Sequence, residues 1–220
     1  MHLRSRSLFC AVVWLVALMG ATPARAAFEM IVRVPSLADI VILDNGPLDT
    51  NPDPSIITVN TQLLNLALGG PSALFQFNTL GAQSNRLVGM ASQMATLQQT
   101  GAVARTTAGS GAQTVTITAV DTSYQFPNPP LVMNTSASDT YTFIPTSPAN
   151  TRTFQSFFDA SNMGVNAMNN PVGIPSTLLS FTAPPGMGPN STSGTAPPTL
   201  LPGNPPPYAL ANQTVITQGP

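Results

Sequence analysis

Lysine is absent from this 220-residue sequence, and histidine, cysteine and tryptophan occur once each, at His2, Cys10 and Trp14. Residues 27–220 therefore contain none of these four side-chain types. Without imidazole, thiol or amine groups, that part of the chain cannot build a usual zinc site, a disulfide, a Ser-His-Asp triad or a Schiff base. Among the common catalytic groups, the carboxylates are left.

Charge of either sign is scarce, since Asp, Glu, Lys and Arg make up 7% of the sequence. Residues 27–220 carry eight carboxylates and four arginines, Arg33, Arg86, Arg105 and Arg152. Their net charge is about −4, and the arginines form no cluster in the sequence. Electrostatic binding to nucleic acid or to anionic lipid is therefore not expected.

The first 26 residues have the three parts of a secretory signal peptide. Arg4 and Arg6 give a basic start, and an uncharged apolar run follows over residues 8–21. As a helix this run is roughly 21 Å long at about 1.5 Å per residue, which is too short for a hydrocarbon core of about 30 Å. Ala24 and Ala26 are small residues of the kind that a signal peptidase accepts. We therefore expect cleavage after Ala26 and a secreted, extracytoplasmic chain with no transmembrane segment.

Alternating apolar residues and β-branched runs, bounded by Gly, Pro, Asn and Asp, predict an all-β fold. Phe28, Met30, Val32 and Val34 share one parity, as in a strand that buries one face. Further candidate strands are 37–43, 56–68, 74–77, 139–144, 153–158, 177–182 and 208–217. The expected architecture is an antiparallel β-sandwich with long Pro-rich loops, formed as a single domain by residues 27–220.

The clearest turn signal lies between two runs rich in Thr and Val or Ala, 103–107 and 114–118. The connecting segment 108–112 contains Gly109 and Gly111, which can adopt the positive φ angles that a chain reversal needs. The sequence therefore predicts that the two runs pair with each other as a β-hairpin.

Two other segments depart from the strand pattern. Apolar residues recur at spacings of three and four within 86–99, which predicts one short helix. The segment 183–207 is rich in Pro and Gly, and proline cannot donate a hydrogen bond to a neighbouring strand. We therefore expect 183–207 to be a mobile loop within the domain.

The densest group of oxygen-bearing side chains lies between residues 44 and 53. It consists of Asp44, Asn45, Asp49, Asn51 and Asp53. Carboxylate and amide oxygens are the ligands that Ca²⁺ takes, so the group is a candidate metal site and Ca²⁺ the candidate cofactor. The same residue types also build turns through hydrogen bonds to the backbone, and their spacing does not match an EF-hand loop. Both interpretations stay open at this point.

Catalysis would have to use a pair of carboxylates, as in glycosidases, where the two groups lie about 5–9 Å apart. Outside the 44–53 segment the candidates are Asp121, Asp139 and Asp159, and nothing in the sequence brings two of them together. No nucleophile with an adjacent base is recognisable. The sequence therefore predicts no catalytic residues and a protein that is not an enzyme.

Several short motifs occur along the chain in an order that resembles a known group. They are Asp44-Asn45-Gly46 before Ile56-Ile57, Asp121-Thr122 after a Thr- and Val-rich run, Phe157-Phe158-Asp159, Thr177-Leu178-Leu179-Ser180, and Tyr208-Ala209-Leu210 before Thr214-Val215-Ile216-Thr217. With these motifs the chain resembles uncharacterised secreted bacterial proteins of the PEP-CTERM type, which usually carry a C-terminal exosortase sorting signal. The resemblance implies an exported β-sandwich associated with the cell surface or an exopolysaccharide matrix, and it implies no catalytic residues.

The sequence departs from that group at its end, because it stops at Gln218-Gly219-Pro220 without the sorting signal. We expect either a released protein or a truncated relative. The functional hypothesis is a secreted, non-catalytic structural or matrix-associated protein. The alternative is a surface module that binds exopolysaccharide or cell-surface proteins, with or without the help of calcium.

Overall fold

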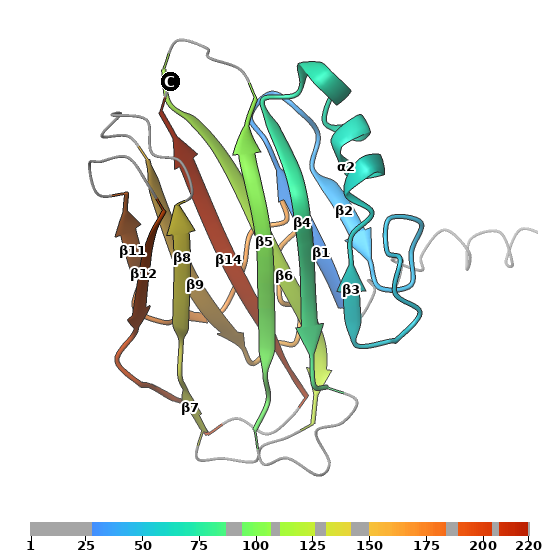
Figure 1. The fold of residues 1–220 in the computed structure, drawn as a ribbon. Helices are drawn as coiled ribbons and strands as arrows, with labels where there is room; N and C mark the ends of the chain where they lie inside the picture. Colours follow the sequence, from blue (N-terminus) through green and yellow to red (C-terminus); the bar gives the residue numbers. More distant parts are fainter. Residues whose placement is uncertain are drawn as a thin grey trace, which may run out of the picture.

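The structure, a computed structural model, describes residues 28–86, 94–106, 111–125, 131–141, 150–183, 189–203 and 207–219. The predicted signal peptide lies outside these ranges. The fold is an antiparallel β-sandwich, which confirms the predicted fold class. Figure 1 shows its two layers of strands packed face to face.

The first layer is a seven-stranded antiparallel sheet with the order β10-β9-β14-β6-β1-β2, in which β11 also pairs with β9. Its strands are β1 (Phe28–Arg33), β2 (Ile40–Leu43), β6 (Gln113–Tyr124), β9 (Thr151–Asp159), β10 (Ile174–Pro175), β11 (Leu179–Thr182) and β14 (Tyr208–Gln218). The last strand in the sequence, β14, lies between β6 and β9 in the middle of the sheet. The sheet is therefore complete only when the C-terminal part of the chain has joined it.

The second layer is made of smaller antiparallel sheets. One contains β3 (Ile56–Thr58), β4 (Phe75–Ser84) and β5 (Leu97–Arg105), another pairs β8 (Ser136–Tyr141) with β12 (Asn190–Thr195), and the last pairs β7 (Leu131–Met133) with β13 (Thr199–Leu201). Helix α2 (Thr61–Ala67) and the short 3-10 helix η1 (Gly70–Ser72) connect β3 to β4. In Figure 1, β3, β4, β5, β8 and β12 lie in front of β6, β14 and β9.

The main hydrophobic core lies between β1, β2 and β6 of the first layer and β3, β4 and α2 of the second. Phe28, Met30 and Val32 are fully buried in it, as their shared parity predicted. Phe75 and Phe77 of β4 pack into the same cluster from the other layer. Alternation along each strand therefore positions both walls of this core.

A segment between β9 and β10, residues 160–173, covers the outer face of the first layer. Its Val165 packs in a buried cluster with Ile31 and Val120. Gly164 has a φ of 72°, and a Cβ atom there would lie 2.2 Å from the Val120 side chain. Only glycine fits this position, because it needs both a positive φ and the space of the missing side chain.

The helix predicted over 86–99 is wrong at residues 94–99, and residues 87–93 lie outside the described ranges. The helix α2 lies in the segment 56–68 that was expected to be a strand, whereas residues 97–99 of the expected helix belong to β5. Leu64 and Leu68, four residues apart, are buried, while Leu66 between them is exposed, and this spacing fits one helix face. The Asn60 side chain caps α2 by accepting a hydrogen bond from the backbone N–H of Leu63.

The helix α2 has seven residues, and none of the helices in the described ranges is long and apolar enough to span a membrane.

The predicted hairpin between 103–107 and 114–118 is also wrong. β5 pairs with β4 in the second layer, and β6 pairs with β1 and β14 in the first. The connection between the two strands therefore crosses from one layer to the other. Glycines permit a reversal but do not choose the partner, and β6 pairs along its edges with β1 and β14 of its own sheet.

The predicted loop over 183–207 contains two strands, β12 and β13, so this part of the secondary-structure prediction is wrong. Both strands pair with segments 49 to 70 residues earlier in the chain, β12 with β8 and β13 with β7. The prolines lie outside them, and the residues of β12 and β13 are therefore free to form ladder hydrogen bonds.

Candidate functional site

The candidate calcium ligands of the 44–53 segment lie in a turn that their own hydrogen bonds build. One carboxylate oxygen of Asp49 accepts hydrogen bonds from the backbone N–H groups of Asn51 and Thr58, each at 2.9 Å. The other oxygen accepts one from the N–H of Asn45 at 3.0 Å. A cation bound to Asp49 would compete with these three donors for the same carboxylate.

The neighbouring side chains have similar roles. The Asn51 amide oxygen accepts a hydrogen bond from the N–H of Asp53 at 2.9 Å, and Asn45 has a positive φ of 57°. Burial, with the nearby carboxylate of Asp49, raises the pKa of Asp44 above its usual range. These contacts favour the turn interpretation of the segment.

Within the ranges that the structure describes, no three Asp, Glu, His or Cys side chains are grouped so that they could hold a metal ion. The calcium site at Asp44, Asn45, Asp49, Asn51 and Asp53 stays a prediction. A thermal melt with and without calcium tests it, because a ligand held only by the folded state must raise the melting temperature.

The three other candidate carboxylates have different hydrogen-bond partners and lie in different places. Asp121 faces the second layer, where its carboxylate accepts a hydrogen bond from the Ser84 hydroxyl of β4. Asp159 faces the opposite side of the same sheet, where it accepts hydrogen bonds from the backbone N–H groups of Met163 and Gly164. Asp139 of β8 is paired with Arg152 of β9 at 2.8 Å. The fold therefore brings no two of these carboxylates into one site.

Asp159 organises the turn that follows β9. Its carboxylate also accepts hydrogen bonds from the hydroxyl and the N–H of Ser161, at 2.6 and 2.9 Å. Burial acts to raise the pKa of Asp159, but the hydrogen bonds from Ser161, Gly164 and Met163 outweigh it and lower the pKa below its usual range. The charged form of Asp159 therefore holds the start of the segment that covers the outer face.

The most buried carboxylate, Asp121, belongs to a polar network that connects the two layers. The Ser84 hydroxyl lies 2.5 Å from Asp121 and 2.8 Å from the hydroxyl of Tyr124. The Arg86 guanidinium donates to Asp121 at 3.0 Å, and the Tyr124 hydroxyl donates to the carbonyl of Thr96. Burial raises the pKa of Asp121 to about 6, although the hydrogen bond from Ser84 and the charge of Arg86 act in the opposite direction.

Asp121, Ser84 and Tyr124 are each at most 2% exposed, whereas the Arg86 side chain is 20% exposed. Sequence analysis missed this network. The parity of Asp121 with Val115, Ile117 and Ala119 signals that its side chain points into the core, but Ser84 lies 37 residues earlier and no local pattern connects the two. The geometry identifies a polar link between the two layers, which we call the Asp121 clasp.

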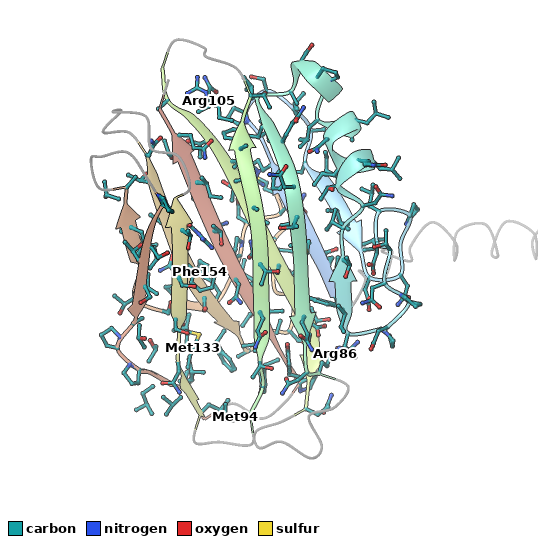
Figure 2. All side chains as sticks on the ribbon, in the orientation of Figure 1. Arg86, Met94, Arg105, Met133 and Phe154 are labelled. Carbon is teal, nitrogen blue, oxygen red and sulfur yellow. The ribbon has the colours of Figure 1, made fainter. Side chains whose placement is uncertain are left out.

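The outward face of the β3-β4-β5 sheet has a different chemistry. Its outward-pointing residues are Ile56 and Thr58 on β3, Gln76, Thr79, Gly81 and Gln83 on β4, and Gln98, Thr100, Ala102 and Ala104 on β5. None of them is charged. Figure 2 shows Arg86 and Arg105 at opposite ends of this sheet.

The neighbouring β8-β12 sheet continues this chemistry with hydroxyl groups alone. The register places Ser136 beside Thr195, Ser138 beside Ser193 and Thr140 beside Ser191. All six residues are exposed, and the hydroxyls of Thr140 and Ser191 lie 2.9 Å apart. The outward sides of the β3-β4-β5 and β8-β12 sheets are thus uncharged and rich in small hydroxyl and amide side chains, whereas the β7-β13 sheet exposes the apolar side chains of Val132 and Leu200.

A groove crosses the outward face of the β3-β4-β5 sheet. It lies over Gly81 and is lined by Thr58, Thr79, Gln83, Gln98 and Thr100, among others. Gly81 pairs with Thr58 of β3 on one side and with Thr100 of β5 on the other. These three residues form a row across the sheet that has side chains at its ends and none at its centre. A Cβ atom at Gly81 would lie 2.8 Å from the Ile57 carbonyl oxygen, which explains why the centre of the row is a glycine.

Comparison of the chain with protein-family models, with curated proteins and with solved structures found no match in any of the three. The resemblance to PEP-CTERM proteins therefore stays a prediction, and the functional argument rests on the residues of this chain.

Proposed function

We propose that this chain is a secreted, non-catalytic structural protein of the cell surface or the extracellular matrix, which acts through surface contact. The observation that carries the proposal is the outward side of the β3-β4-β5 and β8-β12 sheets, where the side chains are uncharged and most of them are hydroxyls or amides. Most protein surfaces keep about 25–35% charged residues for solubility. A face without charge is suited to close contact with another uncharged surface, because no ion has to be desolvated there.

Two further features support a role without catalysis. Residues 27–220 contain no His, Cys or Lys, and the candidate carboxylates Asp121, Asp139 and Asp159 each have local partners and lie apart from one another. The basic and apolar start of the sequence supports export.

The proposal is tested by expressing the full chain in a bacterial host with a secretory pathway and following it by fractionation. We expect N-terminal sequencing to find a chain that begins at Ala27, outside the cytoplasm. In a matrix-forming host, the exported chain should stay with the washed extracellular matrix. A chain that keeps residues 1–26 and stays in the cytosol would contradict the proposal.

A second candidate function, a surface module that binds polysaccharide or protein, is favoured by the groove over Gly81. A binding site needs a concave surface with polar groups placed on it, and this groove is lined by Thr58, Thr100 and Gln98 among others. The two functions differ in one measurable property. A binding module saturates with a soluble ligand, whereas a purely structural protein associates with the matrix without a saturable site.

A further inference from the structure

The side chains around Gly81 form two rows, and the apolar residues Ile57, Leu80 and Ala82 also line the groove. One row contains Thr58, Gly81 and Thr100, and the next contains Ile56, Gln83 and Gln98. Adjacent strands lie about 4.8 Å apart, so Thr58 and Thr100 are separated by roughly 10 Å with the groove between them. The two rows lie roughly 7 Å apart along the strands, because side chains on one face recur at every second residue.

The side chains of these two rows favour a particular kind of ligand. Threonine hydroxyls and glutamine amides both donate and accept hydrogen bonds, and they match a partner whose own groups do both. No arginine lines the groove to pair with an anion, and no carboxylate lines it to pair with a cation. The net charge of about −4 on residues 27–220 also disfavours polyanions in general.

The hydroxyl rows of β8 and β12 extend the uncharged face beyond the groove. Both sheets pack their inward sides on the first layer, through Asn212 of β14 on the Leu97 carbonyl of β5 and through Arg152 of β9 on Asp139 of β8. Their outward sides therefore point the same way, and Figure 1 shows the two sheets next to each other in the front layer. An extended ligand that occupies the groove can continue along further hydroxyl groups.

We propose that the groove over Gly81 binds an uncharged polysaccharide, with Thr58, Gln83, Gln98 and Thr100 as the hydrogen-bonding residues and Ile56 as an apolar contact. A polysaccharide of neutral sugars carries hydroxyl groups that donate and accept, and it brings no charge that the groove would leave unpaired. The inference rests on the proposed surface-contact function and specifies one ligand class and one site for it.

The test measures depletion of the full chain, purified from whichever fraction contains it, by insoluble neutral glucans (cellulose, curdlan and amylose), with calcium alginate beads as the anionic comparison. We expect saturable depletion by at least one neutral glucan and less by alginate. The double variant T58V/T100V keeps the shape of both side chains and removes two hydroxyls, so we expect binding at least about tenfold weaker.

The matched control is T114V/T217V. It removes two hydroxyls that lie 3.0 Å apart on β6 and β14, on the outward side of the first layer. We expect this control to bind as the parent does. Equal binding by T58V/T100V and the parent, equal loss in both double variants, stronger binding to alginate, or no depletion by any neutral glucan would each overturn the inference.

These failures are distinguishable from failure of the proposed function. A chain that is exported and stays with the matrix but binds no neutral glucan overturns the ligand and leaves the structural role. A chain that stays in the cytosol overturns the structural role, whatever the binding assay gives.

Discussion

The space between the two layers has an apolar half and a polar half. In the apolar half, Met30, Ile117, Phe75 and Phe77 pack from both sheets with side chains that are at most 3% exposed. In the other half, called the polar half, β14 and β9 face β5 and β8 with Asn212, Thr214, Gln99 and the Arg152–Asp139 pair. Phe154 and Phe158 of β9 are buried on the same side, so this half is mixed in character. The two halves share one sheet, so the difference lies in the side chains and not in the backbone.

The polar half depends on specific hydrogen bonds between segments that are distant in sequence. The Asn212 side chain donates to the Leu97 carbonyl at 2.7 Å across 115 residues, and Arg152 donates to the Ser138 carbonyl at 3.1 Å. Within the described ranges, the buried Thr214 hydroxyl and the Gln99 amide oxygen have no hydrogen-bond partner. The comparison indicates that the apolar half provides most of the stability and that the polar half fixes which strands face each other.

The largest effect is expected from the apolar half. Replacing Phe77, which is 1% exposed, by alanine removes a large side chain from a packed core and should lower the free energy of unfolding by about 4 kcal/mol. Chemical denaturation measures this loss. The control is L200A, since Leu200 is 76% exposed and its loss should change stability by less than about 0.5 kcal/mol. Similar losses in both variants would show that Phe77 does not pack in the core of the apolar half.

The Asp121 clasp should make stability depend on pH. Burial raises the pKa of Asp121 in the folded state to about 6, above its ordinary value of 3.8. The folded state then binds the proton more tightly than the unfolded state. The contribution of Asp121 to the free energy of unfolding is therefore largest below about pH 4. It falls, by about 3 kcal/mol at most, as the pH rises to about 6 and above.

The measurement compares the free energies of unfolding of the parent and D121N between pH 4 and pH 7. The pKa values of Asp39 and Asp159 are lowered in the folded protein, and both groups are present in both proteins, so their opposite pH dependence cancels in the difference. The parent should gain stability relative to D121N as the pH falls. A difference that does not vary with pH would show that Asp121 keeps an ordinary pKa.

The ion pair of the polar half is expected to have a smaller effect. The side chains of Arg152 and Asp139 are 17% and 13% exposed, and R152M leaves a shielded carboxylate without its cation. We expect the free energy of unfolding to fall by about 2 kcal/mol. The double variant R152M/D139N should recover part of this loss, because the unpaired charge is gone. No recovery would mean that Arg152 acts mainly through its hydrogen bond to Ser138.

The smallest predicted effect has the opposite sign. Thr214 is 1% exposed, and its hydroxyl has no hydrogen-bond partner in the described part of the chain. T214V keeps the side-chain shape and removes the unsatisfied oxygen, so it should raise the free energy of unfolding by about 1 kcal/mol. The control T118V removes a hydroxyl that accepts a hydrogen bond from Gln213 and should not stabilise. Destabilisation by T214V would show that the hydroxyl is satisfied in solution.

The alternation of apolar and polar residues predicted some of the strands correctly. It located β1 and the buried face of β6, because a period of two assigns each residue to one side of a strand whatever the partner is. It failed at 56–68, where Leu64, Leu66 and Leu68 alternate but Leu64 and Leu68 share a helix face. Three leucines at every second position fit the pattern of a strand and also part of the pattern of a helix. The N-cap at Asn60 favours the helix.

The site could be predicted to a similar extent. The 44–53 segment was found as a group of oxygen-bearing residues, but the three hydrogen bonds to Asp49 depend on where Thr58 lies and needed the fold. The outward hydroxyls of β8 follow from alternation once β8 is known to be a strand. Their pairing with Ser191, Ser193 and Thr195 does not, since 183–207 was expected to be a loop.

By itself the sequence determined which chemistry is available, because the set of side chains is the same in any fold: residues 27–220 have carboxylates, hydroxyls and amides, and no imidazole, thiol or amine. It also determined which faces of individual strands are apolar. The tertiary structure decided the partners, among them β14 between β6 and β9 and Ser84 beside Asp121. Partner choice depends on contacts between segments tens of residues apart, and a local pattern contains no information about them.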